Sequence, residues 1–176
     1  MNTITLCSII DWWTLSLYDG YRLSMLTTFG EKTTMGIDMD LINPKLAEML
    51  KELDSLGTIR SQGIDDYLSD EESKQSTLRA FEILAQCVTD ISSHIVVQND
   101  WGNAESYGQS LDTLSMRGVI SQDLTRKLRS FIAMNYLIRT FPTSDYKAIW
   151  DAIQSTSEDV KIFIDNVRSY LEEIVH

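Results

Sequence analysis

The stretch from Ser121 to Phe141 constrains the fold more than any other part of the chain, because it reads as one uninterrupted helix. Its apolar residues recur at spacings of three and four, which places them on one helical face. Ser121 is a residue type that caps helix N-termini, and Pro142 removes the backbone donor that a further turn would need. A helix of this length predicts a domain built largely from helices.

Four further segments carry the same signature, in which apolar residues recur every three or four positions. They run from about Leu41 to Leu56, from Ser69 to about Gln98, from Tyr107 to Met116 and from Asp145 to Val175. Gly57 is expected to end the first, and Ser69 with Glu72 forms a capping box at the start of the second. The last is either continuous or broken at Ser155–Ser157. Residues 41–176 are therefore predicted to form an all-α, antiparallel bundle of four or five helices.

Residues 1–40 differ in composition from the rest, being rich in threonine, serine and aromatic residues and interrupted by glycines. We predict a less regular N-terminal extension here, outside the helical bundle. It is either loosely ordered or an upstream read-through, since Met35 and Met39 are alternative starts to Met1. In a second interpretation it docks on the bundle or on a partner through its aromatic residues, as aromatics do at interfaces. Those residues are Trp12, Trp13 and Tyr18.

The net charge of −11 argues against a broad phosphate-binding surface, since such surfaces need many lysines and arginines, although a small basic cleft remains compatible with it. The two cysteines, Cys7 and Cys87, are far apart in sequence, so neither a disulfide framework nor a zinc site is expected. A reducing cytoplasm is the default location for such a chain. No apolar run is long enough to span a membrane, and Asp11 interrupts the apolar N-terminus, which disfavours a secretory signal. We expect no metal or cofactor.

The order of the segments carries more information than their helical pattern alone. RAFEILAQCVTDISSHIV is followed by YGQSLDTLSMRGVISQDLTRKLRSFIAMNYLIRTF and then by YKAIWDAIQSTSEDVKIFIDNV. From about Leu41 to Val175 this arrangement resembles HEPN-domain proteins of the HepT kind. In that family the motif helix carries an arginine, a polar residue, a few apolar residues, a histidine, any residue and a tyrosine. The corresponding positions here are Met134, Asn135, Arg139 and Phe141.

The resemblance implies a homodimer whose motif helices meet across the dimer axis and form a metal-independent ribonuclease site. It also implies the toxin half of a toxin–antitoxin pair, with a small nucleotidyltransferase as the usual partner. In some systems that partner adds AMP to the motif tyrosine. RNA would be a ligand only if the ribonuclease site were active.

Three of the four motif positions lack the group that the chemistry needs. RNA cleavage without metal requires proton transfer, which histidine performs near neutral pH, and a cation on the phosphate. Met134 cannot clamp a phosphate, Arg139 does not release its proton near neutral pH, and Phe141 has no hydroxyl to accept AMP. Asn135 fits the polar position.

Three hypotheses follow for the function. In the first, the protein is a non-catalytic or weakly catalytic homodimer that holds a nucleotidyltransferase-like partner. The apolar residues Met134, Leu137, Ile138 and Phe141 then form the dimer seam, unless they instead belong to the intramolecular core. In the second, an altered ribonuclease site uses Arg139 and Asn135 and recruits His94, which otherwise is a structural histidine. Lys127 and Arg129 would assist a phosphate there, or simply lie on a solvated helix face. In the third, the chain is a helical substrate-binding module of a nucleotidyltransferase.

Overall fold

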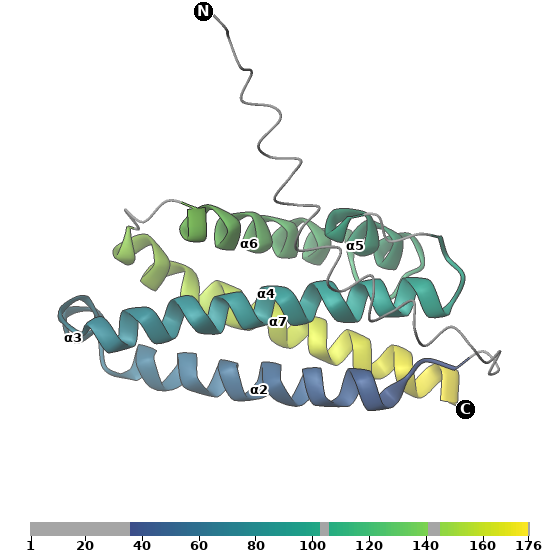
Figure 1. Ribbon diagram of the computed structural model, residues 1–176, viewed down its shortest axis with the longest axis horizontal. Coiled ribbons are helices and arrows are strands. Elements are labelled where there is room, and N and C mark those ends of the chain that lie inside the picture. Colours follow the sequence, from purple (N-terminus) through teal and green to yellow (C-terminus); the bar gives the residue numbers. More distant parts are fainter. Residues whose placement is uncertain (1–35, 103–105, 141–144, 176) are drawn as a thin grey trace, which may run out of the picture. The chain divides into compact units, whose positions relative to one another are not determined.

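Every regular element in the described part of the chain is an α-helix. The computed structural model describes residues 36–102, 106–140 and 145–175. The helices are α2 (Met39–Ser61), α3 (Ile64–Ser69), α4 (Glu71–Gln98), α5 (Tyr107–Met116), α6 (Gln122–Thr140) and α7 (Tyr146–Val175) (Figure 1). The predicted all-α bundle is confirmed, with the short α3 added to the expected helices. Residues 1–35 of the predicted N-terminal extension lie outside the described residues, so the boundary of this extension stays a prediction.

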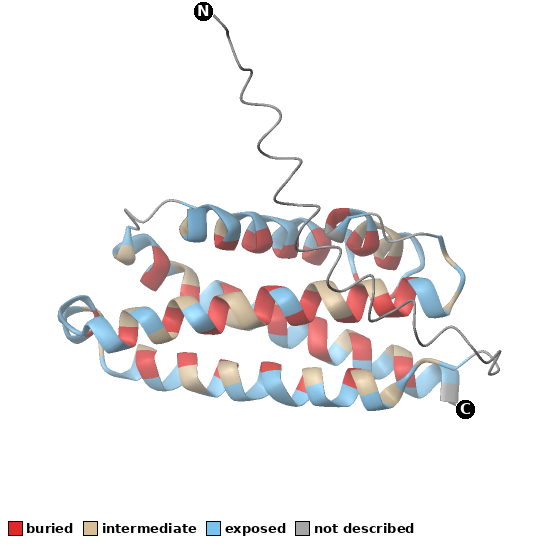
Figure 2. Ribbon diagram, in the orientation of Figure 1, coloured by how far each residue is buried: buried red, intermediate tan, exposed pale blue. Residues whose placement is uncertain are grey.

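Helix α4 is the central element of the bundle. It packs against α2 on one side, against α5 and α6 on another, and also against α3 and α7 (Figure 1). Its inward residues are fully buried and apolar, and they include Phe81, Leu84, Val88, Ile91 and Ile95. Figure 2 shows buried positions on the faces by which the helices meet. Because α4 is covered on several sides, its sequence is apolar around more of its circumference than that of a surface helix.

This apolar character gives α4 the length and hydropathy of a membrane span. Of its most apolar window, 61% is buried inside the bundle. A helix that is covered by its own domain to this extent has most of its apolar surface already removed from water. We therefore interpret α4 as the core helix of the bundle.

Two helix boundaries differ from the sequence-based expectation. Gly57 lies inside α2, which continues to Ser61 because Leu56 and Ile59 on either side of it are buried. That burial outweighs the cost of a glycine in a helix, which is about 1 kcal/mol. Helix α4 is capped by Asp70 rather than Ser69, since the Asp70 carboxylate accepts from the backbone N–H groups of Glu72 and Ser73 at 3.1 and 3.2 Å.

The C-terminal helix α7 is continuous through the serine-rich stretch at residues 155–157. Thr156 is buried there, and the Ser155 hydroxyl donates to the carbonyl of Ala152 at 3.2 Å. The burial of Thr156 against the bundle therefore outweighs the weak helix preference of these residues. The alternative of two separate helices in this region is therefore wrong.

Candidate functional site

Helix α6 is positioned by a tight turn that joins it to α5. Gly118 adopts φ of 78°, a left-handed conformation that favours glycine, and the Val119 N–H donates to the Leu114 carbonyl at 2.9 Å. The Ser121 hydroxyl then accepts from the Leu124 N–H at 3.1 Å, which confirms the predicted N-cap. From this start α6 packs against α4, α5 and α7.

The described motif positions, Met134, Asn135 and Arg139, occupy the C-terminal half of α6 and do not share one face. Asn135 points inward and is only 8% exposed. Met134 is half-buried and packs against the core, as does Ile138. Arg139 is on the surface, with its side chain 59% exposed. Phe141 lies outside the described residues.

Arg139 is held by a carboxylate from the central helix. Its Nη1 lies 2.8 Å from Oε1 of Glu82 on α4, and both side chains remain about half exposed. A guanidinium bound in this way keeps its charge, but a phosphate would have to compete with Glu82 for it. The position where the family places a proton carrier is thus occupied by a fixed, paired cation.

The other cations on α6 are paired as well. Lys127 contacts Asp159 at 3.1 Å and Asp123 at 3.3 Å, and the hydrogen bond to Asp159 is the main cause of its raised pKa. Arg129 reaches across to Asp112 on α5, with its Nη1 2.6 and 2.8 Å from the two carboxylate oxygens. Both side chains are about half exposed, and their carboxylate partners on other helices lie on α7 and α5, whereas Arg139 is paired with Glu82 of α4.

An open pocket of about 660 Å³ lies on this outer face between α5 and α6. Its lining residues are Asp112, Gln122, Asp123, Thr125, Arg126, Arg129 and Ser130. Both arginines in it are bound by its two aspartates, Arg126 by Asp123 and Arg129 by Asp112. Because the opposite charges cancel within the pocket, it has no net attraction for an anion.

His94 does not approach Arg139 within one chain. It follows Glu82 on α4 by twelve residues, which is about 18 Å at 1.5 Å per residue. The ring is 6% exposed, and its Nε2 accepts a hydrogen bond from the Asp38 N–H at 3.1 Å. Burial lowers the pKa of His94, although the Asp38 carboxylate opposes this shift. The arrangement fits a structural histidine.

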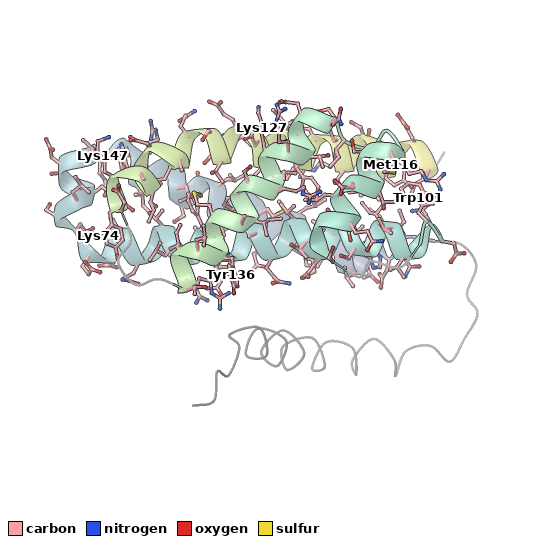
Figure 3. The ribbon with its side chains drawn as sticks, turned by 90° about the horizontal axis from the view of Figure 1, so that it is seen from above. Lys74, Trp101, Met116, Lys127, Tyr136 and Lys147 are labelled. Carbon is pink, nitrogen blue, oxygen red and sulfur yellow. The ribbon has the colours of Figure 1, made fainter. Side chains whose placement is uncertain are left out.

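One pair of residues in the motif half was only partly anticipated from the sequence. Tyr136 is 62% exposed and Leu137 is 53% exposed, and Figure 3 shows Tyr136 at the edge of α6. The sequence predicts a seam position for Leu137 but not for Tyr136. Spacing alone does not reveal this exposure, since Tyr136 follows the buried Ile132 by four residues, a separation that places two residues near the same helical face.

Within the described ranges, no three side chains of histidine, cysteine, aspartate or glutamate are grouped so that they could hold a metal ion. The site therefore offers paired cations, one buried amide and an exposed apolar pair. Such a set can bind another surface. It does not supply a group that donates and accepts protons near neutral pH.

Comparisons with known proteins relate this arrangement to one family. The family model described as ribonuclease HepT-like matches residues 47–167. A tRNA nuclease HepT from Aphanizomenon flos-aquae (strain 2012/KM1/D3) is 22% identical over 136 residues, which cover 77% of this chain and 92% of the relative.

Solved structures show the same fold. A tri-AMPylated Shewanella oneidensis HEPN toxin in complex with an MNT antitoxin superposes with a TM-score of 0.68 at 20% identity, covering 75% of this chain and 99% of that one. A crystal structure of a toxin–antitoxin with AMP-PNP gives the same TM-score at 20% identity, covering 74% of this chain and 99% of that one. At this identity the likeness establishes the fold and leaves the chemistry to the residues present.

Proposed function

The chain belongs to the HepT-like ribonuclease family. From this premise we propose that it acts by binding a protein partner and not by cleaving RNA. In this proposal the C-terminal half of α6 forms the seam of a homodimer. The dimer holds a nucleotidyltransferase partner of the MNT kind in the cytoplasm, as one component of a toxin–antitoxin-type pair. The ribonuclease activity that the family name implies is lost or weak.

The observation that carries this proposal is the state of Arg139. A catalytic group at this position would have to take up and release a proton during each turnover. Arg139 keeps its proton and is bound to Glu82 at 2.8 Å. Losing general acid–base help alone typically slows a reaction by about 10²–10⁴-fold. Met134, at the position of the family's phosphate clamp, adds no charge to offset that loss.

The exposed pair Tyr136 and Leu137 supports the dimer seam. Both side chains are more than half exposed, and they follow the buried core positions along α6. Tyrosine is enriched at interface centres because it buries a large apolar ring and keeps a hydroxyl for a hydrogen bond. Met134 and Ile138, which had been candidates for the same seam, pack against the chain's own core instead. The seam that we propose therefore centres on Tyr136 and Leu137.

The proposed partner rests on the relatives. The matching HEPN toxin from Shewanella oneidensis is in complex with an MNT antitoxin, the second matching structure is a toxin–antitoxin with AMP-PNP, and this chain covers nearly all of the length of both matched chains. The helical fold that those complexes share is present here in full from α2 to α7. A nucleotidyltransferase expressed together with this chain should co-purify with it.

The ribonuclease part is tested by incubating the purified protein with a mixed RNA substrate in the presence of a metal chelator. We expect the wild-type protein and Arg139→Ala to leave the RNA equally intact. Metal-independent cleavage by the wild type that disappears in Arg139→Ala would show that an altered but active site exists. A His94→Gln variant, tested in parallel, would then decide whether that site recruits the histidine.

A further inference from the structure

The start of α2 is joined to the central helix by a hydrogen bond to an imidazole, in addition to its apolar packing. Helices α2 and α4 run antiparallel, so the first turn of α2 lies beside the last turns of α4 (Figure 1). There His94 Nε2 accepts a hydrogen bond from the backbone N–H of Asp38 at 3.1 Å. The bond joins residues 56 positions apart in the sequence. It is therefore a tertiary contact, formed only when the two helices are docked.

The residue that His94 holds is also the N-cap of α2. The Asp38 carboxylate Oδ1 accepts from the N–H groups of Asp40 at 3.0 Å and Leu41 at 3.3 Å. The Asp38 carbonyl also accepts from the N–H groups of Leu41 and Ile42, both at 3.2 Å. Helix caps of this kind contribute about 1 kcal/mol to helix stability. Holding Asp38 in place therefore holds the first turn of α2.

The hydrogen bond requires one protonation state of the ring. Nε2 can accept only while its lone pair is free, so the neutral ring must carry its proton on Nδ1. When a second proton binds, Nε2–H becomes a donor that faces the Asp38 N–H, which is also a donor. Because the ring is almost fully buried, no water shell is available to take over the bond.

We propose that His94 is a proton-operated latch on the start of α2: the neutral ring holds the backbone of Asp38 against α4, and the protonated ring releases it. Release loosens the N-cap of α2, while Ile37, Met39 and Leu41 still pack against the core. The core farther along α2, at Leu46, Met49 and Leu53, stays docked because it is buried.

The polar and charged groups around the His94 ring are engaged with other partners, so they do not take over its hydrogen bond to Asp38. On α2 the Asp38 carboxylate lies nearby, but its Oδ1 is engaged with two backbone amides. On α4 the nearest charged residue along the helix is Asp90, one turn before His94. Its Oδ2 lies 2.6 Å from Nζ of Lys45 on α2. Toward α5, Ser93 on the neighbouring position meets the Ser110 hydroxyl at 3.1 Å. Toward α7, the Tyr170 hydroxyl donates to Asn99 at 3.0 Å.

The direction of the pH dependence follows from burial. Because burial lowers the pKa of His94, the docked state binds fewer protons than the released state. The latch is therefore closed at neutral pH, and it weakens as the pH falls below the ordinary histidine value of about 6.5. This range lies above that in which ordinary carboxyl groups titrate, so the effect is separable from acid unfolding.

The test is amide hydrogen exchange followed by NMR from about pH 7.5 to about pH 5.5, with intrinsic exchange rates divided out, on the full chain. We expect protection of the Asp38 amide to fall by about fivefold, as for the loss of one hydrogen bond, with the midpoint at which the His94 ring titrates. The Leu124 amide, bound to the Ser121 cap on α6 without a histidine, should not change.

Two variants complete the test. His94→Gln keeps an acceptor near the position of Nε2 but does not titrate, so Asp38 protection should be retained and flat with pH. His94→Phe fills the space without an acceptor, so protection should be low throughout. Unchanged Asp38 protection in the wild type across this range would overturn the latch, and so would an equal fall in His94→Gln. If the variants do not fold, different midpoints for the ring and the Asp38 amide in the wild type contradict it equally.

Discussion

The two halves of helix α6 differ in what they give to the protein. The N-terminal half begins at the Ser121 cap, buries Leu124 and Leu128, and pairs each of its cations with a carboxylate. The C-terminal half carries the family's motif positions and exposes Tyr136 and Leu137. In the first half, the apolar residues are buried and the cations are paired within the chain, whereas the second half leaves apolar side chains exposed to water.

We propose that this helix keeps its fold while its catalytic groups differ from those of the family. Folding depends on the inward face, where the buried residues are Leu124, Thr125, Leu128, Phe131, Ile132 and Asn135. Among the described motif positions, Arg139 lies on the surface and Met134 packs against the core as an apolar residue, so neither disturbs the bundle. In this proposal the second half of α6 serves as a binding surface, while the first half holds the bundle together.

The largest effect is expected from the inward face of the first half. Phe131 is buried and meets Phe81 of α4 edge to face, with ring centroids 5.5 Å apart. Phe131→Ala should lower the free energy of unfolding by about 3–5 kcal/mol, because it removes a buried ring and leaves a cavity. Urea denaturation at one fixed chain concentration measures this, since dimerisation would otherwise shift the apparent stability. The matched change Leu137→Ala, on the exposed side, should cost far less.

The next effect separates the packed from the exposed residues of the motif half. Met134→Glu places a charge against the core, so it should lower the free energy of unfolding by about 1–3 kcal/mol. Leu137→Glu, three positions later and more than half exposed, should leave the stability of the single chain nearly unchanged. Equal losses in both variants, measured by urea denaturation at low concentration, would remove the distinction between these two positions.

A smaller effect is expected where α5 meets the first half of α6. A Cβ added at Gly108 would lie 3.3 Å from Nη2 of Arg129, so this guanidinium must shift by a few tenths of an ångström. Relative to Gly57→Ala, Gly108→Ala should disturb the pair between Arg129 and Asp112 and cost no more than about 1 kcal/mol, as exposed ion pairs contribute little. Thermal unfolding compared with Gly57→Ala, where no atom lies within 4 Å of the added Cβ, provides the control.

The smallest effect concerns the ion pair of the motif half. Arg139→Ala removes the contact with Glu82 between two half-exposed side chains. Such pairs typically contribute about 0–1 kcal/mol, so the unfolding midpoint in urea should barely move. A loss of several kcal/mol would mean that Arg139 is part of the structural core and not a surface remnant of the motif.

Much of the helical frame could be predicted because its signals are local. The Ser121 cap, the bounds of α5 at Tyr107 and Met116, and the end of α4 at Gln98 all follow from neighbouring residues. The errors at Gly57 and Ser69 have different causes. In the first, burial across the bundle overrode a local stop signal; in the second, two adjacent residues could both cap, and Asp70 has the better geometry.

The candidate site was less predictable because its contacts join distant parts of the chain. The motif frame could be aligned, and Asn135 and Arg139 could be located on it. The pairing of Arg139 with Glu82 on α4, and of Arg129 with Asp112 on α5, depends on how the helices dock. Which motif residues face outward was also undecided by spacing alone, since Met134 and Leu137 are both apolar and differ only in the neighbours that cover them.

The central claim is that the exposed half of α6 is a binding surface. Sedimentation velocity on the wild-type protein and on Leu137→Glu, at micromolar concentration and ordinary salt, tests it most directly. The wild type should sediment as a dimer and the variant as a folded monomer, because a charge at the seam would be buried without a partner. Gln122→Glu, on the exposed start of the same helix, should remain dimeric. A wild type that sediments as a monomer, or a Leu137→Glu variant that stays dimeric, would contradict the claim.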